Sequence, residues 1–174
     1  MYYTVTCGTK KSVISMSISL GLALAALAAG ISIGVAGLSA MIGVGIAGIA
    51  GAGVVAENPK QFRSVLILQA LPQTQAVYGL LAGILIMLGV GMFKAELVDV
   101  PVTTGIAVLG VALAVGVTSL SAVSQGAIAT AGINACDKQP SAFGKSVVLA
   151  AMAETFAIFG LAGGVLMLIV LGLL

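Results

Sequence analysis

One carboxyl group lies in a long apolar stretch near the end of the sequence. From Ser146 to Leu174 the chain carries a single ionisable side chain, that of Glu154. At about 1.5 Å per residue, a helix over this stretch is long enough to cross a bilayer. A carboxylate at such depth costs about 2.5–3.5 kcal/mol on insertion scales. It is retained only where it is neutral, paired or bound to a cation, so Glu154 predicts a functional site.

A second apolar stretch, from Leu68 to Gly79, supplies polar groups at helical spacing. At about 100° per residue, one helix face carries Leu71, Thr74, Gln75 and Tyr78, whereas Gln69 and Gln73 fall on the opposite face. Pro72 has no N–H group, so backbone carbonyls in the preceding turn become available as ligands. A third apolar stretch adds Ser121, Ser124 and Gln125.

These groups offer oxygen acceptors, which hard cations prefer as ligands. The carboxylate of Glu154 with three or four neutral oxygens neutralises one monovalent cation, whereas Ca²⁺ or Mg²⁺ would leave net charge in lipid. The phenol of Tyr78 can donate a hydrogen bond to the carboxylate and hold its rotamer. The alternative is that the Gln and Thr side chains only join helices, at about 0.6 kcal/mol per hydrogen bond. That simpler role is favoured for Gln69 or Ser121 alone.

Composition indicates where such a site must lie. The chain has 174 residues, of which 60% are hydrophobic and 7% charged, as is typical of an integral membrane protein. Apolar runs of this length predict helices rather than a β-barrel, whose strands are shorter and alternate. The net charge of +2 argues against a nucleic-acid partner, and the absence of His excludes His-based metal sites. We expect Cys7 and Cys136 to form no disulfide and no metal site.

Charged residues and prolines divide the chain into four expected helices. We expect a first hairpin over residues 1–93, with helices at about 12–56 and 64–93, and a connecting loop at 94–101. The second hairpin is expected over residues 102–174, with helices at about 102–136 and 146–174. The first helix would be roughly 66 Å long, about twice the thickness of a hydrocarbon core, so it must project, tilt or break.

The charges near the beginning of the sequence resemble those of a secretory signal. Lys10 and Lys11 precede an apolar run, but this run continues without charge to Ala56, so we expect a retained membrane helix.

Loop charges give only a weak prediction of the orientation of the chain in the membrane. Lys60, Arg63, Lys138 and Lys145 lie in the two hairpin loops, against Lys10, Lys11 and Lys94 on the other side, which favours cytoplasmic hairpin loops.

The two hairpins are internal repeats. A shift of 81 residues aligns Gly45 with Gly126, and the matching continues without a gap. Further matches are Pro59 with Pro140, Phe62 with Phe143, Thr74 with Thr155, and Gly79 with Gly160. Because each hairpin contains two spans, both hairpins are expected to cross the membrane in the same direction. The same shift places Gln73 opposite Glu154, so the repeat has one carboxyl group.

The motifs LQALPQTQAVYG (68–79) and AAMAETFAIFG (150–160) resemble those of a known family. They are similar to the proteolipid, also called the K or c subunit, of V-type and archaeal A-type rotary ATPases, and most of all to its sodium-translocating bacterial branch. The resemblance covers nearly the whole chain and implies an all-α membrane protein of four transmembrane helices, built as two tandem hairpins and assembled into a rotor ring. Gln73 departs from the family pattern, in which we expect a smaller residue.

By this resemblance, one Na⁺ would be held by five residues, and a sixth would orient the carboxylate. They are Glu154, Gln125, Thr74, Gln75, the backbone carbonyl of Leu71 and, as the group that orients the carboxylate, Tyr78. The implied cargo is Na⁺, with H⁺ as the alternative, and no organic cofactor is expected. No ATP site is expected in this chain, which would be a non-catalytic, ion-translocating subunit.

The resemblance also implies partners. These are identical subunits in a ring, a stator subunit with an essential Arg, a central-stalk subunit at loops 57–63 and 137–145, and membrane lipid. The implied location is the cell membrane, crossed several times. ATP-driven rotation would be coupled to Na⁺ transport. A cation-coupled secondary transporter is a second alternative, although such proteins commonly contain inverted repeats. A purely structural membrane oligomer would have no need of Glu154.

Overall fold

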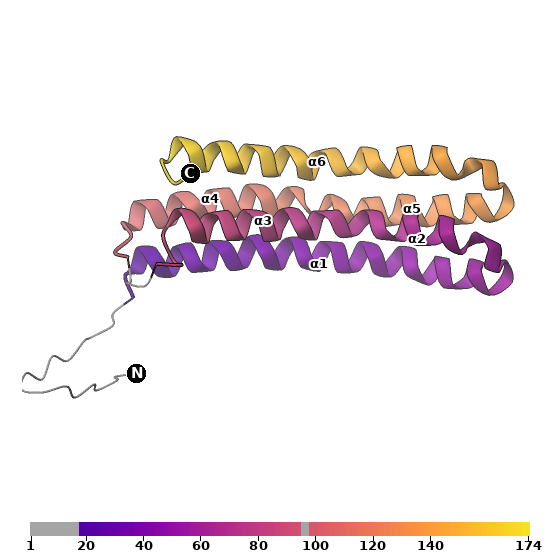
Figure 1. Ribbon diagram of the computed structural model, residues 1–174, viewed down its shortest axis with the longest axis horizontal. Helices are drawn as coiled ribbons and strands as arrows, with labels where there is room; N and C mark the ends of the chain where they lie inside the picture. The colour runs from indigo at the N-terminus through magenta and orange to yellow at the C-terminus, as the bar shows by residue number, and fades with distance from the viewer. Residues whose placement is uncertain (1–17, 95–97) are drawn as a thin grey trace, which may run out of the picture.

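The computed structural model describes residues 18–94 and 98–174, and all regular structure in these ranges is helical (Figure 1). The α-helices are α1 (Leu20–Glu57), α2 (Phe62–Ala70), α3 (Thr74–Gly89), α4 (Val102–Thr118), α5 (Ser121–Lys138) and α6 (Phe143–Val170). Three short 3₁₀ helices are η1 (Pro59–Gln61), η2 (Leu71–Gln73) and η3 (Pro140–Ala142). Together they form four helical spans long and apolar enough to cross a membrane. The predicted all-α fold with four spans is confirmed.

The first span begins later than expected. Helix α1 starts at Leu20, where the hydroxyl of Ser19 accepts a hydrogen bond of 3.2 Å from the backbone N–H of Leu22. Such a cap satisfies one of the free donors at a helix start, which explains why the helix begins there rather than near residue 12. Cys7, Lys10, Lys11 and the first residues of the expected helix lie outside the described residues.

The second span is interrupted at Pro72, although a single helix was predicted over residues 64–93 with only a disturbed hydrogen bond at this proline. A 3₁₀ turn, η2, replaces α-helical geometry between α2 and α3. The span also ends at Gly89 rather than at residue 93, because Gly91 adopts a left-handed conformation with φ of 78°. The loop that follows includes residues 95–97, which are outside the described residues, so the expected position of Glu96 is not described.

The third span is broken, although an unbroken helix was predicted over residues 102–136. Helix α4 ends at Thr118 and α5 begins at Ser121. The hydroxyl of Ser119 donates a hydrogen bond of 2.7 Å to the carbonyl of Val115, and the backbone N–H of Leu120 bonds three residues back. Hydroxyl groups that bond to the preceding turn compete with the helical pattern and bend helices, which accounts for the break.

The fourth span begins earlier and ends earlier than predicted. Helix α6 starts at Phe143, directly after η3, rather than at residue 146. It ends at Val170 rather than at residue 174, and Gly172 beyond it has a positive φ of 68°. The span still places Glu154 well inside the helix.

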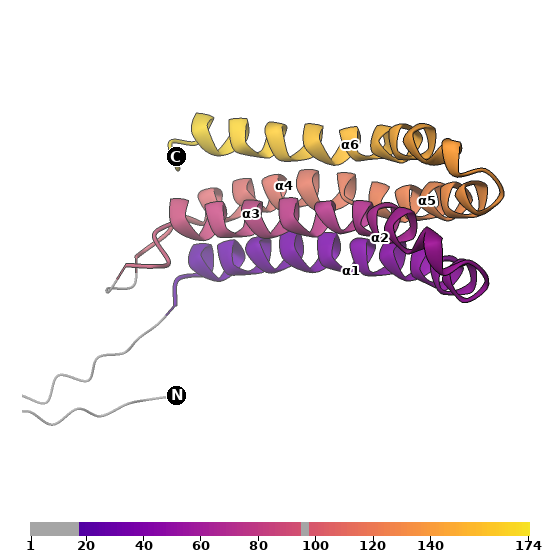
Figure 2. The same ribbon diagram turned by 45° about the vertical axis from the view of Figure 1, so that its right-hand side comes forward.

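The spans form a layered bundle with α1 at one side and α6 at the other (Figures 1 and 2). Helix α1 packs against α3, α4 and α5, and α6 packs against α4 and α5. The α1–α2 and α5–α6 connections lie at one end of the bundle, and the α3–α4 connection lies at the other. The two hairpins therefore run in the same direction, as predicted for repeats that each contain two spans.

Close backbone contacts hold the bundle together at the two helix breaks. A Cβ atom on Gly43 would lie 2.8 Å from Cβ of Pro72, and one on Gly126 would lie 2.7 Å from the carbonyl carbon of Gly43. Small residues let helices approach this closely in a membrane. The hydroxyl of Ser39 in α1 donates a hydrogen bond of 2.8 Å to the carbonyl of Ser119. Helix α1 thus contacts both breaks, through Gly43 at Pro72 and through Ser39 at Ser119.

Candidate functional site

Glu154 of α6 and Tyr78 of α3 are joined directly. The phenol of Tyr78 donates a hydrogen bond of 2.6 Å to Oε1 of Glu154. This distance is typical of an O–H donor that bonds to a carboxylate. Both side chains are half-buried. The bond fixes one carboxyl oxygen of Glu154 and leaves Oε2 available for another partner.

The two glutamines predicted for the site also meet. Nε2 of Gln75 in α3 donates a hydrogen bond of 2.7 Å to Oε1 of Gln125 in α5. Nε2 of Gln125 in turn donates a bond of 3.1 Å to the backbone carbonyl of Ala150 in α6. Both glutamines are fully buried, with 0% of their surface exposed. A buried amide without partners would be costly. The chain of hydrogen bonds from Gln75 through Gln125 to Ala150, called the relay below, therefore stabilises the packing of three helices.

The relay also fixes which way each amide points. A backbone carbonyl can only accept, so the amide nitrogen of Gln125 must face Ala150, and its oxygen then faces Gln75. Oε1 of Gln75 is consequently turned towards Thr74, whose hydroxyl lies 3.3 Å away. The same hydroxyl donates a hydrogen bond of 2.8 Å to the carbonyl of Leu71.

The predicted site residues therefore form two groups. Leu71, Thr74, Gln75 and Gln125 belong to the relay, and Tyr78 and Glu154 form the second group. Among the described residues, no hydrogen bond joins Glu154 to the relay directly. The connection runs along α6, since the relay ends on Ala150, one helical turn before Glu154.

Chemically, this arrangement is a set of oxygen acceptors around one acid. The break at η2 sets the carbonyl of Leu71 beside the hydroxyl of Thr74, and the relay orients both amide oxygens. Glu154 is the one acidic or basic residue well inside the four spans, because the others of the described chain lie near the helix ends. Carbonyl, hydroxyl and amide oxygens with a single carboxylate are suited to one hard monovalent cation.

The sequence did not reveal two features of the site. The carbonyl of Ala150 accepts from Gln125, and only its position four residues before Glu154 could have suggested this role. The hydroxyl of Ser121 is buried without a hydrogen-bond partner among the described residues, so it does not act there as the interhelical link considered for it. It lies one turn before Gln125.

Gln69 and Gln73 of the second span point away from the site, as the helical spacing predicted. Gln69 packs against α1, since a Cβ atom on Gly48 would lie 2.6 Å from its Nε2 atom. Gln73, the counterpart of Glu154 in the repeat, is exposed. It lines an open pocket between α1 and α3.

Comparison with known proteins gives consistent matches. The family model for the C subunit of ATP synthase matches the chain twice, over residues 27–86 and 109–167. The chain is 43% identical over 148 residues to A-type ATP synthase subunit K of Methanocaldococcus jannaschii, covering 85% of this chain and 63% of that protein. It is 38% identical over 112 residues to V-type sodium ATPase subunit K of Enterococcus hirae, covering 64% of this chain and 68% of that protein. The chain thus spans a little less than two thirds of the archaeal relative.

Proposed function

Because the chain belongs to the family of the ATP synthase C subunit, we propose that it is a rotor-ring subunit of a V-type or A-type ATPase that carries one Na⁺ on Glu154. It would lie in the cell membrane as a multi-pass protein and couple ATP-driven rotation to Na⁺ transport. The observation that carries the proposal is the oriented oxygen relay from Leu71 to Ala150 beside the Tyr78–Glu154 pair.

The choice of Na⁺ rests on the neutral groups. A proton site needs a carboxylic acid and one acceptor, which Glu154 and Tyr78 alone could provide. Thr74, Gln75 and Gln125 would then be superfluous, although their side chains are held in one orientation by hydrogen bonds. A cation needs several oxygens at once, so their presence favours Na⁺ as cargo. The sodium ATPase relative from Enterococcus hirae adds to this argument.

In the proposed mechanism, the charge on the carboxylate decides where the site can go. With Na⁺ bound, Glu154 is neutralised, and the site can pass through lipid at low cost. Tyr78 holds the carboxylate towards the relay during this passage. At the stator, a positively charged Arg and a water-filled path would compete for the carboxylate and release the ion. Each ion carries about 2.3 kcal/mol per 100 mV of membrane potential.

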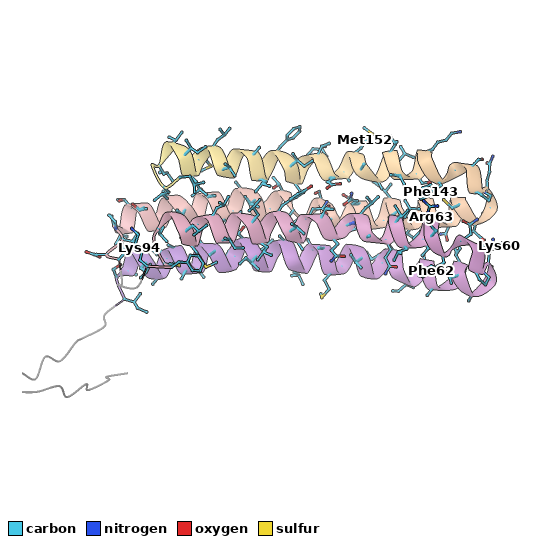
Figure 3. The ribbon with its side chains drawn as sticks, viewed as in Figure 1. Lys60, Phe62, Arg63, Lys94, Phe143 and Met152 are labelled. Carbon is cyan, nitrogen blue, oxygen red and sulfur yellow. The ribbon has the colours of Figure 1, made fainter. Side chains whose placement is uncertain are left out.

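The hairpin loops are the proposed contact with a central stalk. Glu57, Lys60 and Arg63 lie in or beside the first loop, and Asp137, Lys138 and Lys145 in or beside the second. Figure 3 shows Lys60, Phe62, Arg63 and Phe143 at this end of the bundle and Lys94 at the other. Because both loops lie at the same end, one soluble partner could contact both.

One carboxyl group for four helices affects the proposed direction. A ring built from such chains carries fewer ions per turn than one with a carboxyl group in every hairpin. Each ion then receives more of the energy of ATP hydrolysis, which favours pumping over synthesis. A secondary transporter is the weaker alternative, because the two hairpins run in the same direction rather than as inverted repeats.

The full chain, purified in mild detergent, tests the proposal. A projection image should show a closed ring, and equilibrium binding of radioactive sodium should saturate at one ion per chain. The Glu154→Gln variant should still form the ring but bind no sodium. A wild-type ring that binds no sodium would reject the choice of Na⁺ and favour H⁺, whereas a stable monomer would reject the rotor.

A further inference from the structure

The exposed pocket beside Gln73 corresponds in position, under the internal repeat, to the surroundings of Glu154. It has a volume of about 460 Å³ and lies between α1 and α3. Under the 81-residue shift, its lining residues Val44, Gly45, Gln73 and Ala76 correspond in order to Gln125, Gly126, Glu154 and Ala157. The pocket is therefore the first-repeat counterpart of the candidate ion site, and it is open on one side.

The open side can be identified from the second repeat. Around Glu154, that side is closed by α3, whose Gln75 bonds to Gln125 and whose Tyr78 bonds to Glu154. The counterparts of Gln75 and Tyr78 are Phe156 and Phe159 of α6. Helices α1 and α6 lie on opposite sides of the bundle in both views, so these residues cannot reach the pocket of their own chain (Figures 1 and 2).

The corresponding face of α6 is unpartnered in the single chain. Met152, Phe156 and Phe159 are 64%, 62% and 70% exposed, and they lie on one helix face at spacings of four and three residues. Figure 3 shows Met152 on the side of α6 that faces away from the other helices. Met152 is the counterpart of Leu71. The whole face thus repeats the part of η2 and α3 that closes the ion site.

We propose that this pocket receives a second copy of the chain, with Phe156 and Phe159 of that copy lying against Val44 and Gln73. The contact between α3 and the second hairpin within one chain is the template for the contact between α6 and the first hairpin of the next. The inference rests on the proposed ring and adds which residues meet between neighbouring copies.

The side chains at this interface suit packing rather than ion binding. The Gln75–Gln125 pair is replaced by Phe156 and Val44, which are apolar. The Tyr78–Glu154 pair is replaced by Phe159 and Gln73, which together have neither a carboxylate nor a phenol. Gln73 provides a neutral amide at the depth where Glu154 provides a charge. The interface therefore holds no cation, and aromatic side chains fill the space that the ion and its ligands occupy in the other repeat.

Cross-linking in the membrane tests the inference. In a full-length chain with Cys7→Ser and Cys136→Ala, the pair Val44→Cys and Phe156→Cys is treated with a short bifunctional maleimide. Side chains of this size separate the backbones beyond the reach of a disulfide, so a spacer is needed. The expected result is a ladder of covalent multimers. The control replaces Phe156→Cys with Ile158→Cys, about 200° around α6, and should yield at least tenfold less multimer.

Ring assembly of each variant is checked by size-exclusion chromatography before cross-linking. If the first pair does not assemble, Gln73→Cys with Phe159→Cys tests the same contact. An intact ring in which neither pair forms multimers, or in which the Ile158→Cys control cross-links equally well, overturns the interface and leaves the rotor proposal standing. Failure of the unaltered chain to form a ring contradicts the rotor proposal, and the interface falls with it.

Discussion

The hydroxyl of Tyr78 lies 2.6 Å from Oε1 of Glu154, although 76 residues separate the two in the sequence. The bond spans the two repeats, because Tyr78 belongs to the first hairpin and Glu154 to the second. Neither repeat alone contains both groups, since Phe159 takes the place of Tyr78 in the second and Gln73 that of Glu154 in the first. The candidate site thus depends on two hairpins that have diverged.

Removing the phenol should weaken ion binding without abolishing it. Tyr78→Phe deletes the donor to Glu154 and leaves the relay intact, so we expect sodium affinity to fall about tenfold, as for other groups that orient a ligand. Sodium binding to the purified ring measures this. Ser124→Ala is the matched control, because it also removes a hydroxyl, one that bonds only to the carbonyl of Ser121. An unchanged affinity in Tyr78→Phe would show that the bond does not orient the carboxylate.

Interrupting the relay should have a larger effect. Gln125→Leu removes the acceptor for Gln75 and the donor to Ala150, so both remaining groups lose a buried partner. We expect a loss of about 100-fold in sodium affinity, while the ring persists. The matched control is Gln69→Leu, whose amide faces α1 away from the site. Equal affinities in the two variants would exclude the relay from ion binding.

A new carboxyl group in the interface pocket should not create a second sodium site. Gln73→Glu places an acid among Val44, Gly45 and Ala76, where no amide or phenol is present. We expect the acid to react with dicyclohexylcarbodiimide at a rate that sodium does not change. Peptide mass spectrometry distinguishes modification at position 73 from that at Glu154. Protection of position 73 by sodium would contradict the proposed apolar filling of the pocket.

The close contact of Gly43 in α1 with Pro72 and α5 should tolerate no added side-chain volume. In Gly43→Ala, the new Cβ atom would clash with the backbone carbonyl of Ala122 in α5 and lie 2.8 Å from Cβ of Pro72, so α1 must move away from α5 and from the 3₁₀ turn that presents Leu71. Overpacking of this kind costs about 1–3 kcal/mol. We expect a lower melting temperature of the detergent-purified ring, and sodium should restore part of it by binding. Gly144→Ala, at a position where a Cβ atom meets nothing within 4 Å, should leave the melting temperature unchanged.

The sequence predicted the features that depend on side-chain type, on helical spacing and on the internal repeat. Four long apolar stretches predicted four spans, and the missing N–H of Pro72 predicted a disturbed hydrogen bond at the point where η2 lies. Helical spacing placed Thr74, Gln75 and Tyr78 on one face, and the gapless repeat predicted parallel hairpins. These patterns depend on local geometry and on the cost of polar groups in lipid, both of which can be assessed from the sequence alone.

The features that the sequence did not predict depend on backbone groups and on tertiary contacts. The break at Ser119 depends on which carbonyl its hydroxyl bonds to, and on the support of Ser39 from another helix. The acceptor at Ala150 is a backbone carbonyl, which no residue type marks. The start of α1 depends on the cap at Ser19, one of several serines near the expected boundary.

The most direct test of the account is the reaction of Glu154 with dicyclohexylcarbodiimide at neutral pH, with and without sodium. The carboxyl group adds to the carbodiimide only when it is protonated, so a bound cation should block the reaction. We predict that sodium slows labelling of Glu154 in a concentration-dependent way, that potassium does not, and that more sodium is needed as the pH falls and protons compete. If sodium leaves the rate unchanged at every pH, Na⁺ is not the cargo, and the oxygen relay has another purpose.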